Sequence, residues 1–159
     1  MRSRRETLIL AGAAVLFGLA AADPRQAQAQ ARAWMKAKAQ EPGVLKAPKG
    51  LLYRILTSGP ADGPHPGRMD HVQVRFEARL TDGKLLDATK GAPDDFHMRA
   101  LIEAWAVALP MMRPGDIWEL YAPPELAYGK AGGAGGLVPP YAPLVFKLEL
   151  VSITKAADR

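Results

Sequence analysis

The chain has 159 residues, enough for one domain with a leader or tail, and 48% of them are hydrophobic, enough for a core. The net charge is +5, but basic residues cluster at the start and the rest of the chain mixes both signs, so no nucleic-acid-binding stripe is expected. Cysteine is absent, which excludes disulfides, thiol nucleophiles and thiolate zinc sites. The histidines lack metal-ligand spacing, so we expect neither a metal nor a cofactor.

The first 31 residues have the composition of an export signal. A basic start precedes an apolar stretch, Leu8 to Ala22, which is too short and too rich in small residues for a comfortable membrane span. Cleavage is expected near Ala22 or Ala31, and an uncleaved anchor is the alternative. Two adjacent arginines keep both the Sec and the twin-arginine routes open. We therefore expect a periplasmic or secreted protein with no stable membrane span after processing.

Three further segments are expected: a short helical extension or linker at 32–47, a folded domain at 48–155 and a tail at 156–159. Alanine and lysine predict a helix from Ala31 to Gln40, which Pro42-Gly43 would end. An isolated helix of that length is marginal in water, so we expect it to be loosely docked.

The clearest strand runs from Val72 to Leu80, where apolar and polar residues alternate. Asp82-Gly83 is a hairpin turn signal, so Lys84 to Asp87 is expected to return beside this strand. Other strands are expected at Leu51–Leu56, Ile117–Tyr121 and Leu144–Ile153, with a buried helix at Ala100–Leu109. Strands with one helix packed on one face predict an α+β domain.

A long loop from Pro123 to Pro143 is rich in glycine and proline, and a loop of that length is usually functional. It opens with Pro-Pro-Glu-Leu-Ala-Tyr-Gly, and other blocks are FEARLTDGKLLD at 76–87, LIEAW at 101–105, MRPGD at 112–116 and LVFKLEL at 144–150. In order and spacing these blocks resemble the FKBP-type peptidyl-prolyl cis-trans isomerases, especially the secreted bacterial members. The resemblance implies a strongly bent antiparallel β-sheet wrapped around one short α-helix.

The resemblance also implies an enzyme that rotates X-Pro bonds in unfolded or folding exported polypeptides, using an apolar cleft and no cofactor. The catalytic residues it implies are Phe76, Asp87, Trp105 and Tyr128. The substrate-binding residues it implies are Leu86, Leu101, Ile102, Val138 and Phe146. Trp105 would lie under the substrate proline, while the Tyr128 hydroxyl and the Ile102 backbone N–H would each bind a substrate carbonyl. The simpler alternatives are core packing for the apolar residues, an exposed loop tyrosine and a turn carboxylate.

Departures from the family pattern leave a second function open. Phe76 stands where the family has a tyrosine, whose hydroxyl bonds the carboxylate matched by Asp87. Asp87 is expected to be partly buried, and it must find another partner or be more hydrated. Leu86 replaces a frequent phenylalanine and Asp94 falls near another family aromatic, so we expect a less aromatic pocket. The alternative function is a proline-binding chaperone module with weakened catalysis.

Residues 34–44 resemble only the end of the helical extension through which secreted members often dimerise. The resemblance therefore does not carry dimerisation over to this chain. We favour a monomer.

Overall fold

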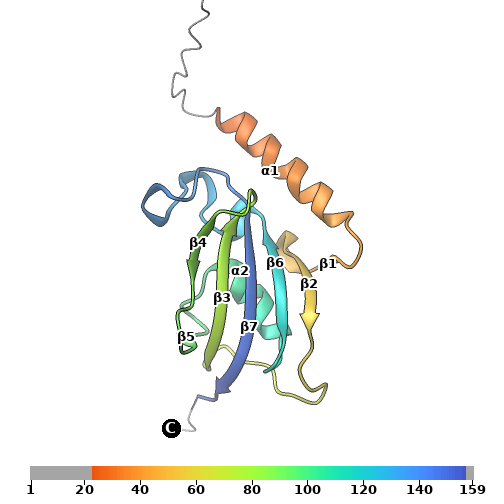
Figure 1. Ribbon diagram of the computed structural model, residues 1–159, viewed down its shortest axis with the longest axis vertical. Helices are drawn as coiled ribbons and strands as arrows, with labels where there is room; N and C mark the ends of the chain where they lie inside the picture. The colour runs from red at the N-terminus through yellow and green to blue at the C-terminus, as the bar shows by residue number, and fades with distance from the viewer. Residues whose placement is uncertain (1–22, 157–159) are drawn as a thin grey trace, which may run out of the picture.

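An antiparallel sheet organises residues 23–156, the part of the chain that the computed structural model describes (Figure 1). The strand order is β1-β2-β6-β7-β3-β4, and β5 pairs separately with β3. The strands are β1 (Leu45–Lys46), β2 (Leu52–Thr57), β3 (His71–Leu80), β4 (Leu85–Ala88), β5 (Asp94–His97), β6 (Ile117–Ala122) and β7 (Leu144–Thr154). All the pairs are antiparallel, as the sequence predicts.

One short helix, α2 (Glu103–Ala108), lies against one face of this sheet (Figure 1). It buries Ala104, Trp105 and Ala108, and a single 3₁₀ turn, Leu109–Met111, follows it. The turn contains Pro110, which has no N–H to donate to a further helical turn. The predicted helix is therefore confirmed, although the regular α-helix begins three residues after Ala100. The antiparallel sheet with this short helix packed on one face confirms the expected α+β fold class.

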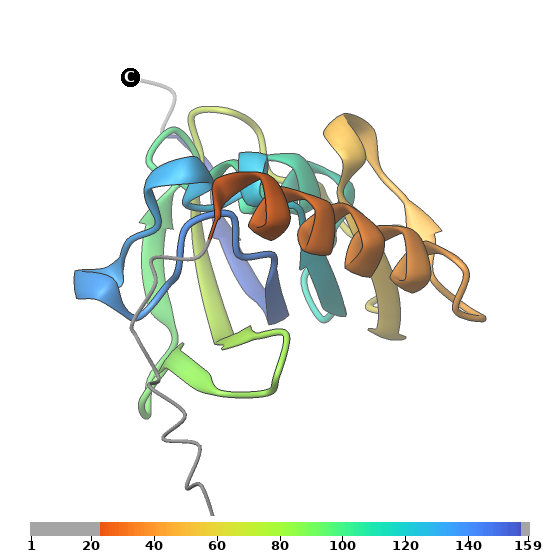
Figure 2. The same cartoon turned by 90° about the horizontal axis from the view of Figure 1, so that it is seen from above.

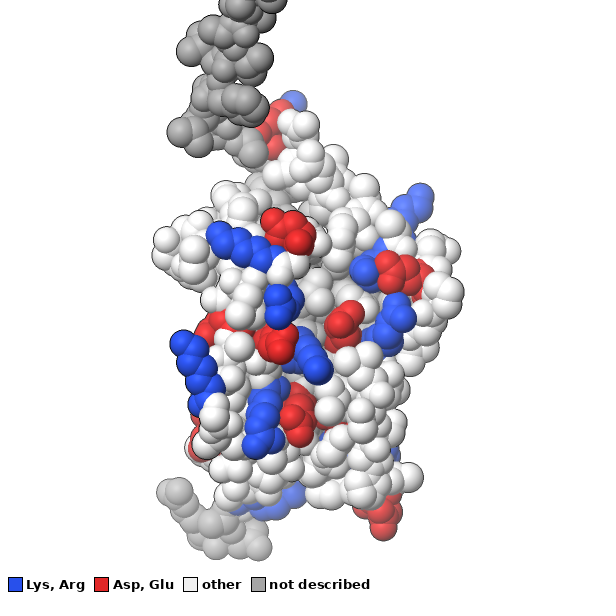
Figure 3. Space-filling view, in the orientation of Figure 1, with Lys and Arg blue, Asp and Glu red and all other residues white. Residues whose placement is uncertain are grey.

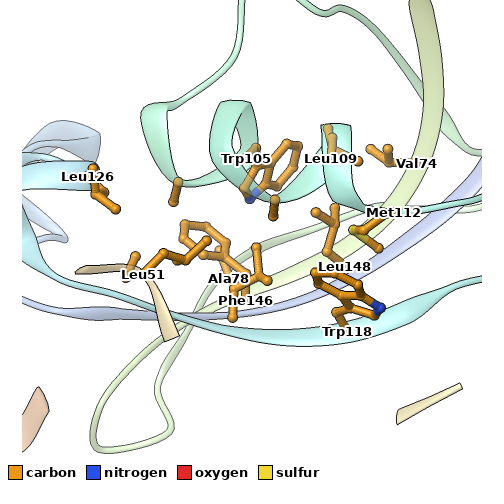
Figure 4. Close-up of a cluster of buried hydrophobic side chains, with 14 of the residues drawn as sticks. Leu51, Val74, Ala78, Trp105, Leu109, Met112, Trp118, Leu126, Phe146 and Leu148 are labelled. Atoms are coloured by element: carbon orange, nitrogen blue, oxygen red, sulfur yellow. The ribbon is translucent and has the colours of Figure 1, made fainter. Parts of the chain in front are cut away.

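The core lies between α2 and the sheet because apolar residues alternate along the long central strands. Val74 of β3 pairs with Leu150 of β7, and both side chains are fully buried. Figure 4 shows Trp105 of α2 facing the sheet residues Ala78 and Phe146, which are also paired across β3 and β7. Burial of these side chains is the main source of the domain's stability.

The outer face of the sheet carries charges of both signs, interspersed over β3 and β7 (Figure 3). Arg75 of β3 pairs with Glu149 of β7, with 3.7 Å between Nη1 and Oε1. The alternation predicted for β3 thus separates an apolar face toward α2 from a charged face toward solvent.

The N-terminal helix, α1 (Pro24–Ala39), begins earlier than the sequence predicts. The Asp23 side chain caps it by accepting the Arg25 backbone N–H at 3.0 Å, and Pro24 occupies the first turn, where a missing N–H costs nothing. The helix crosses one end of the sheet, as Figure 2 shows from above. It therefore includes residues that the sequence analysis assigns to the leader, while the apolar stretch up to Ala22 lies outside the described residues.

Contacts along α1 show that it is docked on the domain. Ala31 is buried, and the Trp34 ring meets the Tyr121 ring edge-on, with 6.2 Å between centroids. Lys38 lies over both rings, 5.3 Å from the Trp34 centroid and 4.8 Å from that of Tyr121. The expected loose helix therefore has a defined place against β6. Within residues 23–156 no helix is long and apolar enough to cross a membrane.

A buried aspartate ties the end of the chain to the loop before β3. Asp70 accepts the backbone N–H groups of Gly67 at 2.6 Å and Ala156 at 2.9 Å, and it pairs with the Lys155 ammonium at 2.9 Å. These three donors hold the pKa of Asp70 down at about 2, the two backbone N–H groups contributing most. The Asp70 carboxylate thus has a structural role, and both of its oxygens accept hydrogen bonds.

Candidate functional site

A cleft of about 320 Å³ opens between α2, the sheet and the loop that follows β6. All the residues that the family resemblance assigns to the site line it: Phe76, Leu86, Asp87, Leu101, Ile102, Trp105, Tyr128, Val138 and Phe146. They come from five separate stretches of the chain, so the tertiary fold brings them together. Among the described residues there is no group of three histidine, aspartate or glutamate side chains placed to hold a metal.

Trp105 forms the bottom of this cleft and is only 5% exposed. Three phenylalanine rings meet it edge-on: Phe76 at 5.0 Å, Phe96 at 5.5 Å and Phe146 at 5.8 Å between centroids. Edge-to-face contacts of this kind are favourable and fix the orientation of each ring. The buried Trp105 Nε1 has no hydrogen-bond partner within the described chain. The result is a rigid, apolar floor with one unused donor.

Phe96 is a cleft residue that the sequence analysis missed. It lies on β5, where Phe96 pairs with Val72 of β3 and its ring also meets Phe76 at 6.5 Å. Asp94, expected near a family aromatic, does not line the cleft, whereas Phe96 does. Asp94 instead accepts the Thr89 hydroxyl at 2.6 Å and holds the preceding loop. The sequence did offer a signal: Phe96 lies two residues after Asp94, on the same face of a strand.

Asp87 is exposed, so the expectation of partial burial is also wrong. It pairs with Ala78 in the β3–β4 ladder, and paired residues of an antiparallel sheet lie on the same face. Ala78 is buried and lines the cleft, so Asp87 lies on the cleft side at its rim. Its Oδ1 accepts the Ala88 backbone N–H at 2.8 Å. The hydrated alternative is therefore the one the structure shows.

Tyr128 stands at the mouth of the cleft with 43% of its surface exposed. Its ring lies against Gly133, where a Cβ atom would overlap ring carbons. Gly133 and Val138 exchange two backbone hydrogen bonds, at 3.0 and 3.1 Å, which close the loop behind the tyrosine. The glycine-rich loop therefore fixes the place of the ring while its hydroxyl has no partner in the described chain.

Leu101 and Ile102 form the side of the cleft next to α2, and both are half-buried. Ile102 is the N-cap of α2, and no side chain caps the helix there. The first backbone N–H groups of a helix have no partner within it. The cleft is thus an apolar space with a few polar groups at its edge: the Ile102 N–H, the Tyr128 hydroxyl and the Asp87 carboxylate.

This bent sheet, its single helix and the aromatic cleft define the class of FKBP-fold domains. The model of the family described as FKBP-type peptidyl-prolyl cis-trans isomerase matches residues 63–151, and the chain belongs to this family. Family membership confirms the resemblance that the sequence blocks carry.

Two named relatives show the extent of the similarity. The chain is 40% identical over 128 residues to the peptidyl-prolyl cis-trans isomerase Mip of Coxiella burnetii, covering 79% of this chain and 54% of that protein. It is 37% identical over 132 residues to the outer membrane protein MIP of Legionella longbeachae, covering 82% and 55%. The chain therefore spans about half the length of the curated relatives it matches.

A solved structure covers nearly the same extent. The crystal structure of a peptidyl-prolyl cis-trans isomerase from Pseudomonas syringae pv. tomato superposes with a TM-score of 0.79 at 36% identity, covering 84% of this chain and 98% of that one. The similarity therefore includes most of the chain.

Proposed function

We propose that this protein is a peptidyl-prolyl cis-trans isomerase that rotates X-Pro bonds in exported polypeptides. The observation that carries the proposal is the apolar cleft over Trp105. Three phenylalanine rings surround Trp105 edge-on, and polar groups lie at the edge of the cleft. A proline ring is apolar and compact, and such a surface binds it without any cofactor. Membership of the FKBP-type family supports the same reaction.

Rotation about a peptide bond requires the amide to lose its resonance, which sets a barrier of about 18–20 kcal/mol. The planar amide is more dipolar than the twisted one, so a dry apolar cleft stabilises it less than water does. Binding the proline ring on Trp105 while leaving the carbonyl of X free to turn lowers the barrier. Only interactions that are stronger in the twisted state accelerate the rotation.

The polar groups at the rim have positioning roles in this mechanism. The Ile102 N–H at the start of α2 would donate to one substrate carbonyl. The Tyr128 hydroxyl would donate to a second carbonyl at the mouth of the cleft. The substrate is thereby held on both sides of the bond that rotates, with no covalent step and no proton transfer.

The setting we propose is the bacterial periplasm or exterior. Support comes from the leader composition of the first residues and from a relative that carries the name outer membrane protein. We also propose that the protein acts as a monomer, because Ala31 and Trp34 of α1 pack on the domain of their own chain. Sedimentation of the protein over a range of concentrations tests this oligomeric state.

A protease-coupled isomerisation assay on the full chain tests the activity. Peptides containing Leu-Pro should convert from cis to trans faster with increasing protein, and the refolding of a proline-limited substrate protein should also accelerate. Peptide binding without acceleration would favour the chaperone module instead. If the peptides neither bind nor convert faster, the proposed function is wrong.

A further inference from the structure

The loop that carries Tyr128 is closed at its base by one backbone hydrogen bond. Tyr141 donates its backbone N–H to the carbonyl of Gly129 at 2.9 Å, and Gly129 directly follows Tyr128 in the chain. Further along the loop, Gly133 and Val138 form a second connection between its two legs. The place of Tyr128 at the mouth of the cleft therefore depends on the base of the loop, where residue 141 lies.

Tyr141 has an uncommon backbone conformation for a residue with a side chain. Its φ of 59° is in the left-handed region, which glycine adopts without strain and other residues adopt at a cost. Gly129, the partner of its N–H, has a φ of 61°, and there the chain does use glycine. Strain of this kind is concentrated at functional positions. The feature that a glycine could not supply at position 141 is the aromatic ring.

Tyr141 lies where the loop meets helix α1, and it is half-buried there. Two grooves run along α1, with volumes of about 190 and 390 Å³. Pro123 lines one groove and Pro139 the other, and these prolines belong to the two legs of the loop. Of the described residues, only Ala31 and Tyr141 line both grooves, so these two residues separate them. Ala31 is 5% exposed, which shows how closely the helix and the loop approach at this point.

We propose that Tyr141 is a positioning residue: by packing against Ala31 of α1, it fixes the base of the loop and thereby the direction of the Tyr128 hydroxyl. The inference rests on the proposed isomerase activity, in which that hydroxyl donates to a substrate carbonyl. With 43% of its surface exposed, Tyr128 is not held by tight packing on every side. Its position therefore depends on its own backbone and on Gly133, against which its ring lies.

Removal of the ring with the backbone path kept tests this role. Tyr141→Gly adopts the same φ without strain, so the bond to Gly129 is kept while the contact with α1 is lost. We expect kcat/KM with a Leu-Pro peptide to fall about three- to five-fold, chiefly through a higher KM, which is the scale of one neutral hydrogen bond. Tyr141→Phe keeps the ring and should keep the wild-type rate. Equal rates for wild type and Tyr141→Gly would overturn the positioning role.

A double-mutant cycle separates an effect through Tyr128 from a general loss of stability. Tyr128→Phe removes the hydroxyl that Tyr141 directs, so adding Tyr141→Gly to it should lower kcat/KM no further. Urea unfolding of each variant gives the folded fraction to which its rate is referred. A loss that persists in the Tyr128→Phe background would mean that Tyr141 has only a structural role.

The helix side of the contact is tested with two arginine substitutions. Ala31→Arg places a long charged side chain at the buried contact and should lower kcat/KM by about the same factor as Tyr141→Gly. Ala33→Arg is the matched control, because Ala33 is exposed on the same helix and lines neither groove, and it should keep the wild-type rate. An unchanged rate with Ala31→Arg would contradict the support of the loop by α1. Absence of catalysis by the wild-type protein would instead count against the proposed function.

Discussion

The two faces of the sheet bury aromatic side chains for different purposes. Trp105 on the cleft side and Tyr121 on the outer side are both nearly inaccessible, at 5% and 1% exposure. Tyr121 donates its hydroxyl to Glu119 at 2.5 Å and lies under Lys38 of α1. Trp105 meets three phenylalanine rings, and its Nε1 donates to nothing in the described chain. Burial alone therefore does not separate a binding residue from a structural one. An unpartnered polar atom does not do so either, because Trp118 Nε1 also lacks a partner in the described chain. What distinguishes Trp105 is that it lines the cleft.

Carboxylates repeat the same contrast. Asp70 is buried and receives three donors, which hold its pKa at about 2. Asp87 is exposed at the cleft and receives one. A satisfied polar group stabilises the fold, whereas a group with unused capacity beside a cavity is available to a ligand.

Two tryptophan substitutions test most sharply the contrast between cleft residues and structural residues. Trp105→Leu should lower kcat/KM by more than about ten-fold, because the proline loses the flat floor on which it binds; ten-fold corresponds to about 1.4 kcal/mol. Trp118 is the control, since it is as buried but does not line the cleft. Trp118→Leu should destabilise the fold and leave the rate nearly unchanged. The peptide assay and urea unfolding separate the two effects, and a folded, fully active Trp105→Leu variant would refute the floor assignment.

On the outer face, Tyr121→Phe should lower the free energy of unfolding by about 1 kcal/mol while activity stays the same. Burial, together with the bond to Glu119, raises the pKa of Tyr121 to about 12. A raised pKa stabilises the fold below the ordinary value of about 10, and that contribution is lost as pH rises toward 12. Urea unfolding between pH 7 and about 11.5 measures both effects. A loss of activity in a stable variant would link α1 docking to the cleft.

A smaller effect is expected inside the cleft from Phe76→Tyr. The added hydroxyl can donate to Asp87 and orient it, so kcat/KM with a Leu-Pro peptide should rise by about two- to four-fold. A double-mutant cycle with Asp87→Asn should show that the gain requires the carboxylate. Equal rates for wild type and Phe76→Tyr would mean that this carboxylate does not orient toward position 76.

The smallest effect appears only in acid. The lowered pKa of Asp70 stabilises the fold above the ordinary carboxyl value near 4, and this contribution disappears as pH falls toward 2. Asp70→Asn should therefore unfold with less dependence on pH over that window than the wild type. Thermal unfolding followed by circular dichroism at pH 2 to 6 checks this, and parallel curves for the two proteins would contradict it.

Local patterns in the sequence were sufficient for most elements of the fold. The alternation from Val72 to Leu80 predicts β3, and Asp82-Gly83 predicts the hairpin to β4, both as found. The strand β5 was not predicted because Phe96 is its only apolar residue, which is too little for a periodic signal. The start of α1 was not predicted because glutamine and alanine are common both in leaders and in helices.

The sequence by itself determined the fold class, the family and many of the cleft residues, since ordered blocks of side chains carry that information. Only the tertiary structure decided how these residues are used. Pairing of β5 with β3 brings Phe96 onto Trp105, although Phe96 follows the family block that ends at Asp87. The register opposite Ala78 places Asp87 on the cleft side yet in contact with water. Burial and partnering depend on contacts between distant segments, and no local pattern specifies those contacts.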